Sequence, residues 1–80
     1  MKIKLTKTKQ FSNDGDSIFG INVGSSVIGN TLDIKGEQGK KPIVGSPFHL
    51  DTYKTSDVQE ILSENTFSTI NAIYKWETIN

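Results

Sequence analysis

The sequence predicts a mainly β fold, a small SH3-like antiparallel barrel of five or six short strands. Apolar residues occur in short runs, and clusters of turn-forming residues separate these runs about every ten residues, which is the spacing of an all-β domain. β-Branched and aromatic residues are concentrated in the longest run, at 67–76. Because the chain has only 80 residues, we expect one small β domain over residues 1–80.

The first two expected strands lie on either side of a dense turn signal. Lys2–Leu5 alternates lysine with aliphatic residues, as a strand with one solvated face does, and its lysines suit an edge strand. Ser, Asn, Asp and Gly at 12–16 then form a turn. The segment 17–23 places apolar side chains at every second position, which predicts the second strand.

The middle of the chain is punctuated by glycine. Gly29-Asn30 is a pair that favours positive φ, so we expect a tight hairpin between 27–28 and 31–34. The segment 35–42 holds no apolar residue before its proline and is expected to be a surface loop. Apolar character returns at 43–50, where Pro47 must begin a strand or lie at a sheet edge, because proline cannot donate to a ladder.

The C-terminal part holds one ambiguous and one clear segment. A Ser-x-x-Gln capping box favours one short helix near 56–63, whereas its threonine and valine neighbours favour a strand, which we prefer. The run 67–76 is expected to be a single central or closing strand. A bulge near Asn71 would let Phe67 and Tyr74 point the same way.

Composition leaves little support for catalysis, so we expect a protein that is not an enzyme and that carries no cofactor or metal. The chain has no cysteine, which excludes a thiolate metal site and a cysteine nucleophile. Its one histidine, His49, lies between apolar residues and is expected to be a half-buried strand residue. Asp14-Gly15-Asp16 lacks the remaining ligands of a calcium loop and is interpreted as a turn. The glycine spacings match no phosphate-binding loop.

Charge and hydropathy narrow the classes of molecule that the protein is expected to bind. Nine lysines balance nine acidic residues and arginine is absent, which disfavours a protein that tracks phosphates along nucleic acid. The basic start is expected to be a solvated strand face (Lys2, Lys4, Lys7 and Lys9). No apolar run approaches the ~20 residues of a membrane helix, and the start lacks a signal core, so we expect a cytoplasmic protein. Since so short a chain builds a small core, we also expect self-association.

Binding, unlike catalysis, requires only flat rings and hydrogen-bonding groups, and the C-terminal third is rich in both. Without arginine, an anionic ligand would be held by lysine, hydroxyls and backbone N–H groups. For each of Phe19, Phe48 and Phe67 we favour a place in the core over a ligand contact. The candidate rings are those of Tyr53, Phe67, Tyr74 and Trp76, and the candidate hydroxyl and amide groups are those of Thr55, Ser56, Thr69 and Asn71.

A pattern in this region resembles that of a known group of proteins: Thr55-Ser56-x-Val58-x-x-Ile61, then Phe67-x-Thr69-x-Asn71-x-x-Tyr74. It is similar to a signature of small phage-borne and bacterial β proteins, which include viral sponges of the anti-CBASS type. The resemblance covers residues 45–77 and departs at Ala72, where serine is usual, so one hydroxyl contact is in doubt.

The resemblance implies a phage-type immune-evasion protein that binds and sequesters cyclic nucleotide signals in the host cytoplasm without cleaving them. It also implies a small homo-oligomer, such as a tetramer. Tyr74 and Trp76 would then stack on bases, and the ammonium group of Lys54 would contact a phosphate. The remaining ligand-binding residues would donate and accept hydrogen bonds (Thr55, Ser56 and Asn71).

Two further hypotheses belong to other classes. A small protein-binding inhibitor of a host defence protein would dock through a sheet edge or an aromatic patch. A barrel that binds single-stranded nucleic acid by stacking would show salt-dependent affinity, and the zero net charge makes it the least favoured of the three.

Overall fold

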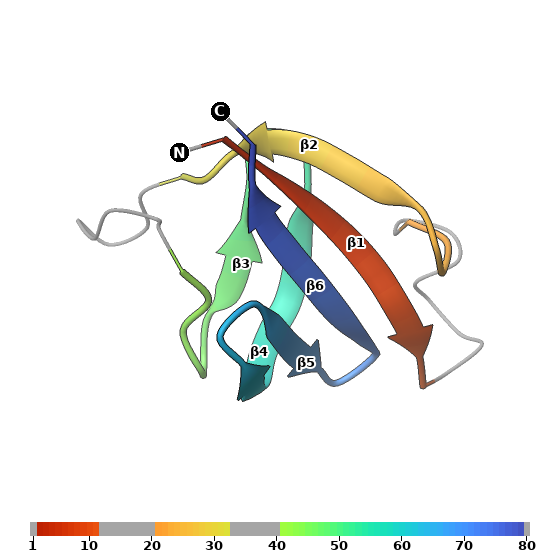
Figure 1. Ribbon diagram of the computed structural model, residues 1–80. Coiled ribbons are helices and arrows are strands. Elements are labelled where there is room, and N and C mark those ends of the chain that lie inside the picture. Colours follow the sequence, from red (N-terminus) through yellow and green to blue (C-terminus); the bar gives the residue numbers. More distant parts are fainter. Residues whose placement is uncertain (1, 12–20, 33–40, 80) are drawn as a thin grey trace.

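The fold is a single antiparallel sheet that curls into a half-barrel. A computed structural model describes residues 2–11, 21–32 and 41–79 (Figure 1). In these residues the sheet has the strand order β2-β1-β6-β5-β4-β3, and there is no helix. The predicted mainly β barrel of five or six strands is therefore confirmed. The strands are β1 (Lys2–Gln10), β2 (Ser26–Asn30), β3 (Pro47–His49), β4 (Lys54–Ser63), β5 (Thr66–Thr69) and β6 (Ala72–Thr78).

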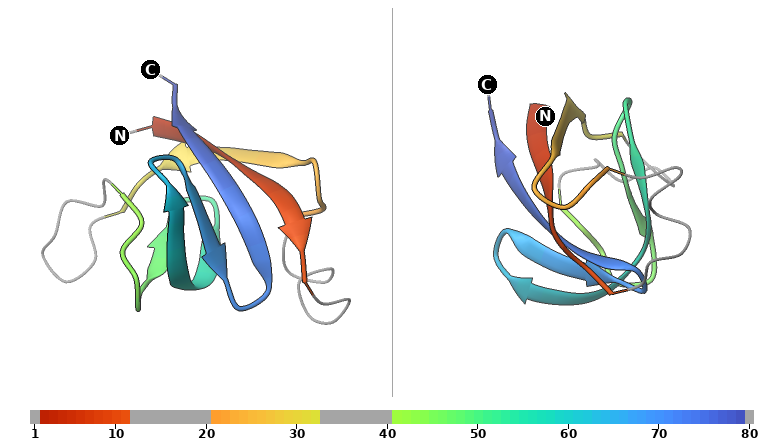
Figure 2. Two further views of the ribbon diagram at one scale, coloured as in Figure 1. Left: turned by 60° about the horizontal axis from the view of Figure 1, so that its bottom comes forward. Right: turned by 90° about the vertical axis from the view of Figure 1, so that its right-hand side faces the viewer.

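The two outer strands, β2 and β3, meet at one end of the curled sheet (Figure 2). An isolated bridge pairs Thr31 with Leu50, just beyond β2 and β3. The Leu32 N–H donates to the His49 carbonyl at 2.9 Å, and the Asp51 N–H donates to the Asn30 carbonyl at 2.9 Å. These backbone bonds close one end of the half-barrel.

A carboxylate reinforces this closure. Asp51 Oδ1 accepts from the backbone N–H of Asn30 at 2.9 Å, and Asp51 Oδ2 accepts from its side-chain amide at 3.2 Å. The hydrogen bond from the Asn30 backbone, followed by that from its side chain, lowers the pKa of Asp51 below its ordinary value of 3.8. The carboxylate form is thus the one that fits the closed end.

The hairpin predicted at Gly29-Asn30 is wrong, because both residues lie inside β2. Gly29 is buried, and a Cβ atom there would meet the side chains of Asp51 and Thr52. Thr52 Oγ1 donates to the Ile28 carbonyl at 3.0 Å. Because Gly29 has no side chain, residues 51–52 can approach β2 closely. Gly29 does not form a turn.

β1 lies between β2 and β6, so the prediction of an edge strand for Lys2–Leu5 is wrong. Its alternation is as predicted: Ile3 and Leu5 are buried, whereas Lys2 is exposed. The same alternation carries Lys7 to the interior, where it is fully buried opposite Tyr74. The basic start is consequently not one solvated face.

The segment before β2 also differs from the prediction. Residues 21–23 of the expected 17–23 strand are not in a strand, and a turn leads through Gly24, whose φ is 89°. The Gly24 N–H donates to the Lys7 carbonyl at 2.7 Å. Residues 17–20, the turn predicted at 12–16 and residues 35–40 of the loop predicted at 35–42 lie outside the described residues.

The predicted single strand at 67–76 is a hairpin of β5 and β6. Its turn forms because Thr69 Oγ1 accepts hydrogen bonds from the N–H groups of Asn71 and Ala72, each at 3.2 Å. Phe67 and Tyr74 do point the same way, with ring centroids 5.5 Å apart, but a turn and not a bulge brings them together. β6 is a central strand, as predicted.

The predictions for 56–63, Pro47 and His49 are confirmed, whereas residues 43–46 of the apolar segment 43–50 lie before β3. β4 spans 54–63 as a strand, so the helix near 56–63 is excluded. Pro47 begins β3, which is also an outermost strand. His49 is half-buried in β3.

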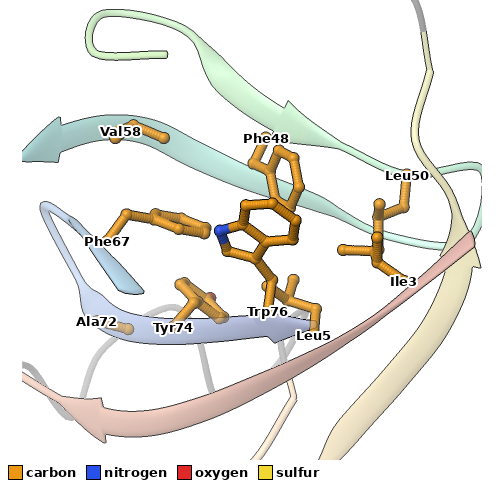
Figure 3. Close-up of a cluster of buried hydrophobic side chains, with 9 residues drawn as sticks. All are labelled: Ile3, Leu5, Phe48, Leu50, Val58, Phe67, Ala72, Tyr74 and Trp76. Carbon is orange, nitrogen blue, oxygen red and sulfur yellow. The ribbon is translucent and has the colours of Figure 1, made fainter. Parts of the chain in front are cut away.

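The core fills the concave face of the sheet (Figure 3). Phe48 packs edge-on against Phe67 at 5.4 Å between ring centroids, and Trp76 lies 6.0 Å from Phe48. The described residues contain no helix of the length and apolar character that crossing a membrane requires. The buried hydrophobic residues are Ile3, Leu5, Phe48, Leu50, Val58, Phe67, Ala72, Tyr74 and Trp76.

Candidate functional site

A cavity of ≈ 220 Å³ lies where the β4–β5 hairpin faces the segment that precedes β3. β4 supplies residues near its end, β5 supplies its first residue, and β6 supplies the indole of Trp76. We refer to this cavity as the Trp76 pocket. Its lining residues are Lys41, Pro42, Ile61, Ser63, Glu64, Thr66 and Trp76.

Trp76 joins the core to the pocket. Its side chain is only 8% exposed and packs against Phe48, and its backbone N–H donates to the Asn65 carbonyl at 2.9 Å in the hairpin turn. Figure 3 shows the indole nitrogen on the side of the ring that faces Phe67. The indole N–H is the single hydrogen-bond donor of this side chain.

Asn65 holds the two hydroxyls of the pocket wall. Ser63 Oγ donates to Asn65 Oδ1 at 3.3 Å, and Thr66 Oγ1 donates to the same oxygen at 3.4 Å. Because each hydroxyl donates its hydrogen to Asn65 Oδ1, the lone pairs of the hydroxyl oxygen remain available as acceptors.

The lining combines apolar and charged groups. Pro42, Ile61 and the indole form the apolar part, and Lys41 and Glu64 add one charge of each sign. The arrangement can enclose a small ring while a cation and a carboxylate contact its polar edges. Among the described residues, no group of three or more histidine or acidic side chains is placed to hold a metal ion.

Of the six ligand-binding residues predicted from the sequence, Trp76 is the one that lines this pocket. Ser56 and Asn71 are brought together elsewhere, where Asn71 Nδ2 donates to Ser56 Oγ at 3.2 Å. Lys54 is exposed at the start of β4, opposite His49.

Thr55 is buried and its hydroxyl is engaged within the chain. Thr55 Oγ1 accepts from the Phe48 N–H at 3.0 Å and donates to the Ser56 carbonyl at 2.7 Å. It thereby ties β3 to β4, which is a structural role.

Tyr74 is also inside the half-barrel. It is 2% exposed, its ring stacks on Phe67, and its hydroxyl lies 3.0 Å from that of Tyr53. Lys7 Nζ is 6.0 Å from the centroid of the Tyr74 ring and donates to Gln10 Oε1 at 3.3 Å. A ligand base could not reach the Tyr74 ring without displacing these core contacts.

No protein-family model, no curated protein and no solved structure matches this chain. Its function is therefore inferred from the side chains that the fold brings together.

Sequence reasoning missed most of the pocket. Lys41 and Pro42 belong to a segment predicted as loop, and the predicted ligand-binding residues included none from 63–66. The available signal was a Ser-Glu-Asn-Thr turn close in sequence to aromatic strands, with one hydroxyl residue before Asn65 and one after it. That pattern predicts a turn, but it does not say which aromatic ring lies beneath it.

Proposed function

We propose that the protein captures a small phosphorylated ring compound of the cyclic-nucleotide class in the Trp76 pocket, without cleaving it. As a phage-type immune-evasion protein, it would sequester such a signal in the host cytoplasm. The observation that carries the proposal is the indole at the inner wall of a cavity that also offers a cation, a carboxylate and two hydroxyls. This proposal keeps Trp76 from the predicted residues and adds the pocket wall from β4 and β5.

The size of the pocket indicates how much of the ligand it holds. Its ≈ 220 Å³ is below the ~300–1,000 Å³ that typical small-molecule sites enclose. One base therefore enters the cavity, and the sugar and phosphate stay at the rim. Lys41 acts there as a point charge toward phosphate, which suits a chain without arginine.

The polar groups favour a base with N–H donors on its edge. The Glu64 carboxylate and the hydroxyls of Ser63 and Thr66 accept hydrogen bonds, and the indole N–H donates one. A guanine edge, which carries adjacent N–H groups and a carbonyl oxygen, complements this set better than a uracil edge does.

The lining supports capture over turnover. Among the described residues, it contains one carboxylate, no histidine and no second carboxylate that could share acid and base roles. His49 lies in β3 and does not line the pocket.

The test uses the single tryptophan of the chain as a reporter. Cyclic di- and trinucleotides are added to the full-length protein while Trp76 fluorescence and the melting temperature are followed. At ~100 times Kd, binding adds about 2.7 kcal/mol, which raises Tm by roughly 10–20 °C in a domain of this size. The nucleotide recovered afterwards should be intact.

Matched lysine variants locate the site. Lys41→Ala is expected to weaken binding about tenfold through loss of one charge-assisted contact, whereas Lys54→Ala, an exposed lysine outside the pocket, leaves Kd unchanged. If no nucleotide alters fluorescence or Tm at about 1 mM, where even a Kd of 1 mM gives half occupancy, the proposal is wrong. A partner protein that co-purifies from host lysate would then favour the inhibitor hypothesis.

A further inference from the structure

β4 has a free edge over its second half. β3 pairs with its first half, through Pro47 with Asp57 and His49 with Lys54, and Val44 forms an isolated bridge with Val58. From Gln59 to Ser63, the side of β4 that faces away from β5 pairs with nothing else in the described part of the chain. We call this segment, 59–63, the free edge.

The free edge exposes aliphatic side chains. All of its residues are exposed, and Ile61 and Leu62 are each 45% exposed. Val44 and Ile43, beside the bridge to Val58, are exposed as well. Proteins commonly protect such edges with lysine or proline, and 59–63 contains neither. An edge of this composition is suited to pairing with another strand.

We propose that the occupant is a second copy of this chain, whose free edge pairs antiparallel with the first about a twofold axis at Ile61. In this register Ile61 lies opposite Ile61 of the second copy, Glu60 lies opposite Leu62, and Gln59 lies opposite Ser63. No charged side chain faces one of like charge within the paired segment.

Charge selects this register over its neighbours. Facing residues of an antiparallel pair share a face of the sheet, so a twofold axis moves along the strand one residue at a time. An axis at Glu60 places Glu60 opposite its own copy, and an axis at Leu62 places Glu60 opposite Glu64. Like charges directly opposite one another are destabilising in a sheet, so the axis at Ile61 is the favoured one.

The irregular shape of β4 limits the pairing to a discrete dimer. β4 is bulged against β5 between Val58 and Glu60 and again between Ile61 and Ser63. Bulges bend and twist a strand, which keeps the pairing short. Because a twofold contact uses the same edge in both copies, it closes on itself and leaves no free β4 edge for a third chain. The interface requires no nucleotide, and it shares Ile61 and Ser63 with the lining of the Trp76 pocket.

Disulfide trapping tests the contact directly, because the chain contains no cysteine. Facing residues of an antiparallel pair have Cα atoms about 4.5–5.5 Å apart, which fits the geometry of a disulfide. In full-length Ile61→Cys, two introduced thiols face each other. At about 10 μM protein, mild oxidation should link this variant roughly 100-fold faster than a variant whose thiols meet only by diffusion, because pairing raises the effective concentration to the order of 1 mM.

Two cysteine controls fix the location and the register. Ile70→Cys places the thiol on the β5–β6 turn, at a side chain that is 70% exposed, and it should link slowly. Leu62→Cys should also link slowly, because Leu62 faces Glu60 and not itself. Equal rates for Ile70→Cys and Ile61→Cys would overturn the interface, and faster linking of Leu62→Cys would overturn the register.

Lysine variants supply a second measurement by analytical ultracentrifugation. The unmodified chain should sediment as a dimer, and Ile61→Lys should raise the dimer Kd about tenfold or more by placing two ammonium groups face to face. Leu62→Lys should keep the dimer, because the new cation faces Glu60. Melting curves establish that each variant is folded. A wild-type chain that is monomeric at about 1 mM, alone or bound to a host protein, contradicts the proposal, since a Kd above 1 mM is weaker than −4.1 kcal/mol.

Discussion

The phenol hydroxyls of Tyr53 and Tyr74 lie 3.0 Å apart and link the turn between β3 and β4 to the central strand β6. The two rings are tilted at 55° with centroids 6.3 Å apart, so they share a hydrogen bond without stacking. The bond lies inside the half-barrel, where Tyr74 is almost wholly buried. It therefore joins the two halves of the curled sheet across its concave face.

Tyr53→Phe is expected to lower the stability of the fold by about 1 kcal/mol, the usual net contribution of one such hydrogen bond. In a domain of this size the Tm should fall by roughly 4–8 °C. Combining Tyr53→Phe with Tyr74→Phe should cost less than the sum of the two single losses, because both remove the same bond. Urea unfolding of the three variants measures this, and strict additivity would show that the two hydroxyls are not coupled.

Gly29→Ala should destabilise the closed end of the barrel, by about 1–3 kcal/mol, since its new methyl group overlaps Asp51 and Thr52. Thr52→Ala removes one of the overlapping side chains. The double variant is therefore expected to lose less than the two single variants together, even though Thr52→Ala alone costs the bond to Ile28. Unfolding free energies of the four proteins complete the cycle, and a zero coupling energy would argue against close approach at Gly29.

The stability of the fold should depend on pH through Asp51. Its pKa in the folded chain is lowered below 3.8 by the hydrogen bonds from Asn30, so the folded state favours the ionised form. The stabilisation is present above the unfolded pKa of about 3.9 and is lost as pH falls through the lower folded value. Comparing Asp51→Asn with the wild type isolates this effect.

The difference in Tm between wild type and Asp51→Asn should be constant from pH 5 to 7 and should shrink as the pH drops below about 4. Asp57→Asn is a suitable control, because Asp57 is an exposed aspartate on β4. A difference that stays the same down to pH 2 would mean that the Asp51 carboxylate does not hold the closure.

Phe67→Ala should cost about 3–5 kcal/mol, which is the range for removing a buried aromatic side chain. Phe67 is fully buried and contacts both Phe48 and Tyr74. Phe11→Ala is the matched control: Phe11 is 52% exposed, and its loss should change stability by less than about 0.5 kcal/mol. Circular dichroism during thermal unfolding distinguishes the two, and equal effects would contradict the assigned core.

The sequence predicted the class of fold because alternation and turn chemistry are local properties. It identified β1 from alternating residues, and it required Pro47 either to begin a strand or to lie at a sheet edge, both of which hold for β3. It could not place β1 inside the sheet, since the pairing of β1 with β2 and β6 depends on residues far along the chain. Lys7 shows the same limit: its charge predicts a solvated face, but the alternation set by Ile3 and Leu5 turns it inward.

Two errors share one physical cause, which is that a local signal has more than one use. Gly29-Asn30 has the composition of a tight turn, yet Gly29 is needed because another segment packs against it. The run 67–76 is rich in strand-forming residues, yet the Thr69 hydroxyl caps a turn within it. For the candidate site, Trp76 could be predicted from its residue type, whereas its neighbours from β4 and from 41–42 required the folded chain.

The closure between β2 and β3 concerns only one end of the sheet, and this has a consequence for motion. Separating those two strands breaks few backbone bonds, namely those that involve Thr31, Leu32 and Asp51, and it leaves the ladders of β1 with β6 intact. Amide hydrogens at this seam should accordingly exchange with solvent earlier than those of the central strands. The two outer strands, β2 and β3, should therefore separate from each other before any other pair of neighbouring strands does.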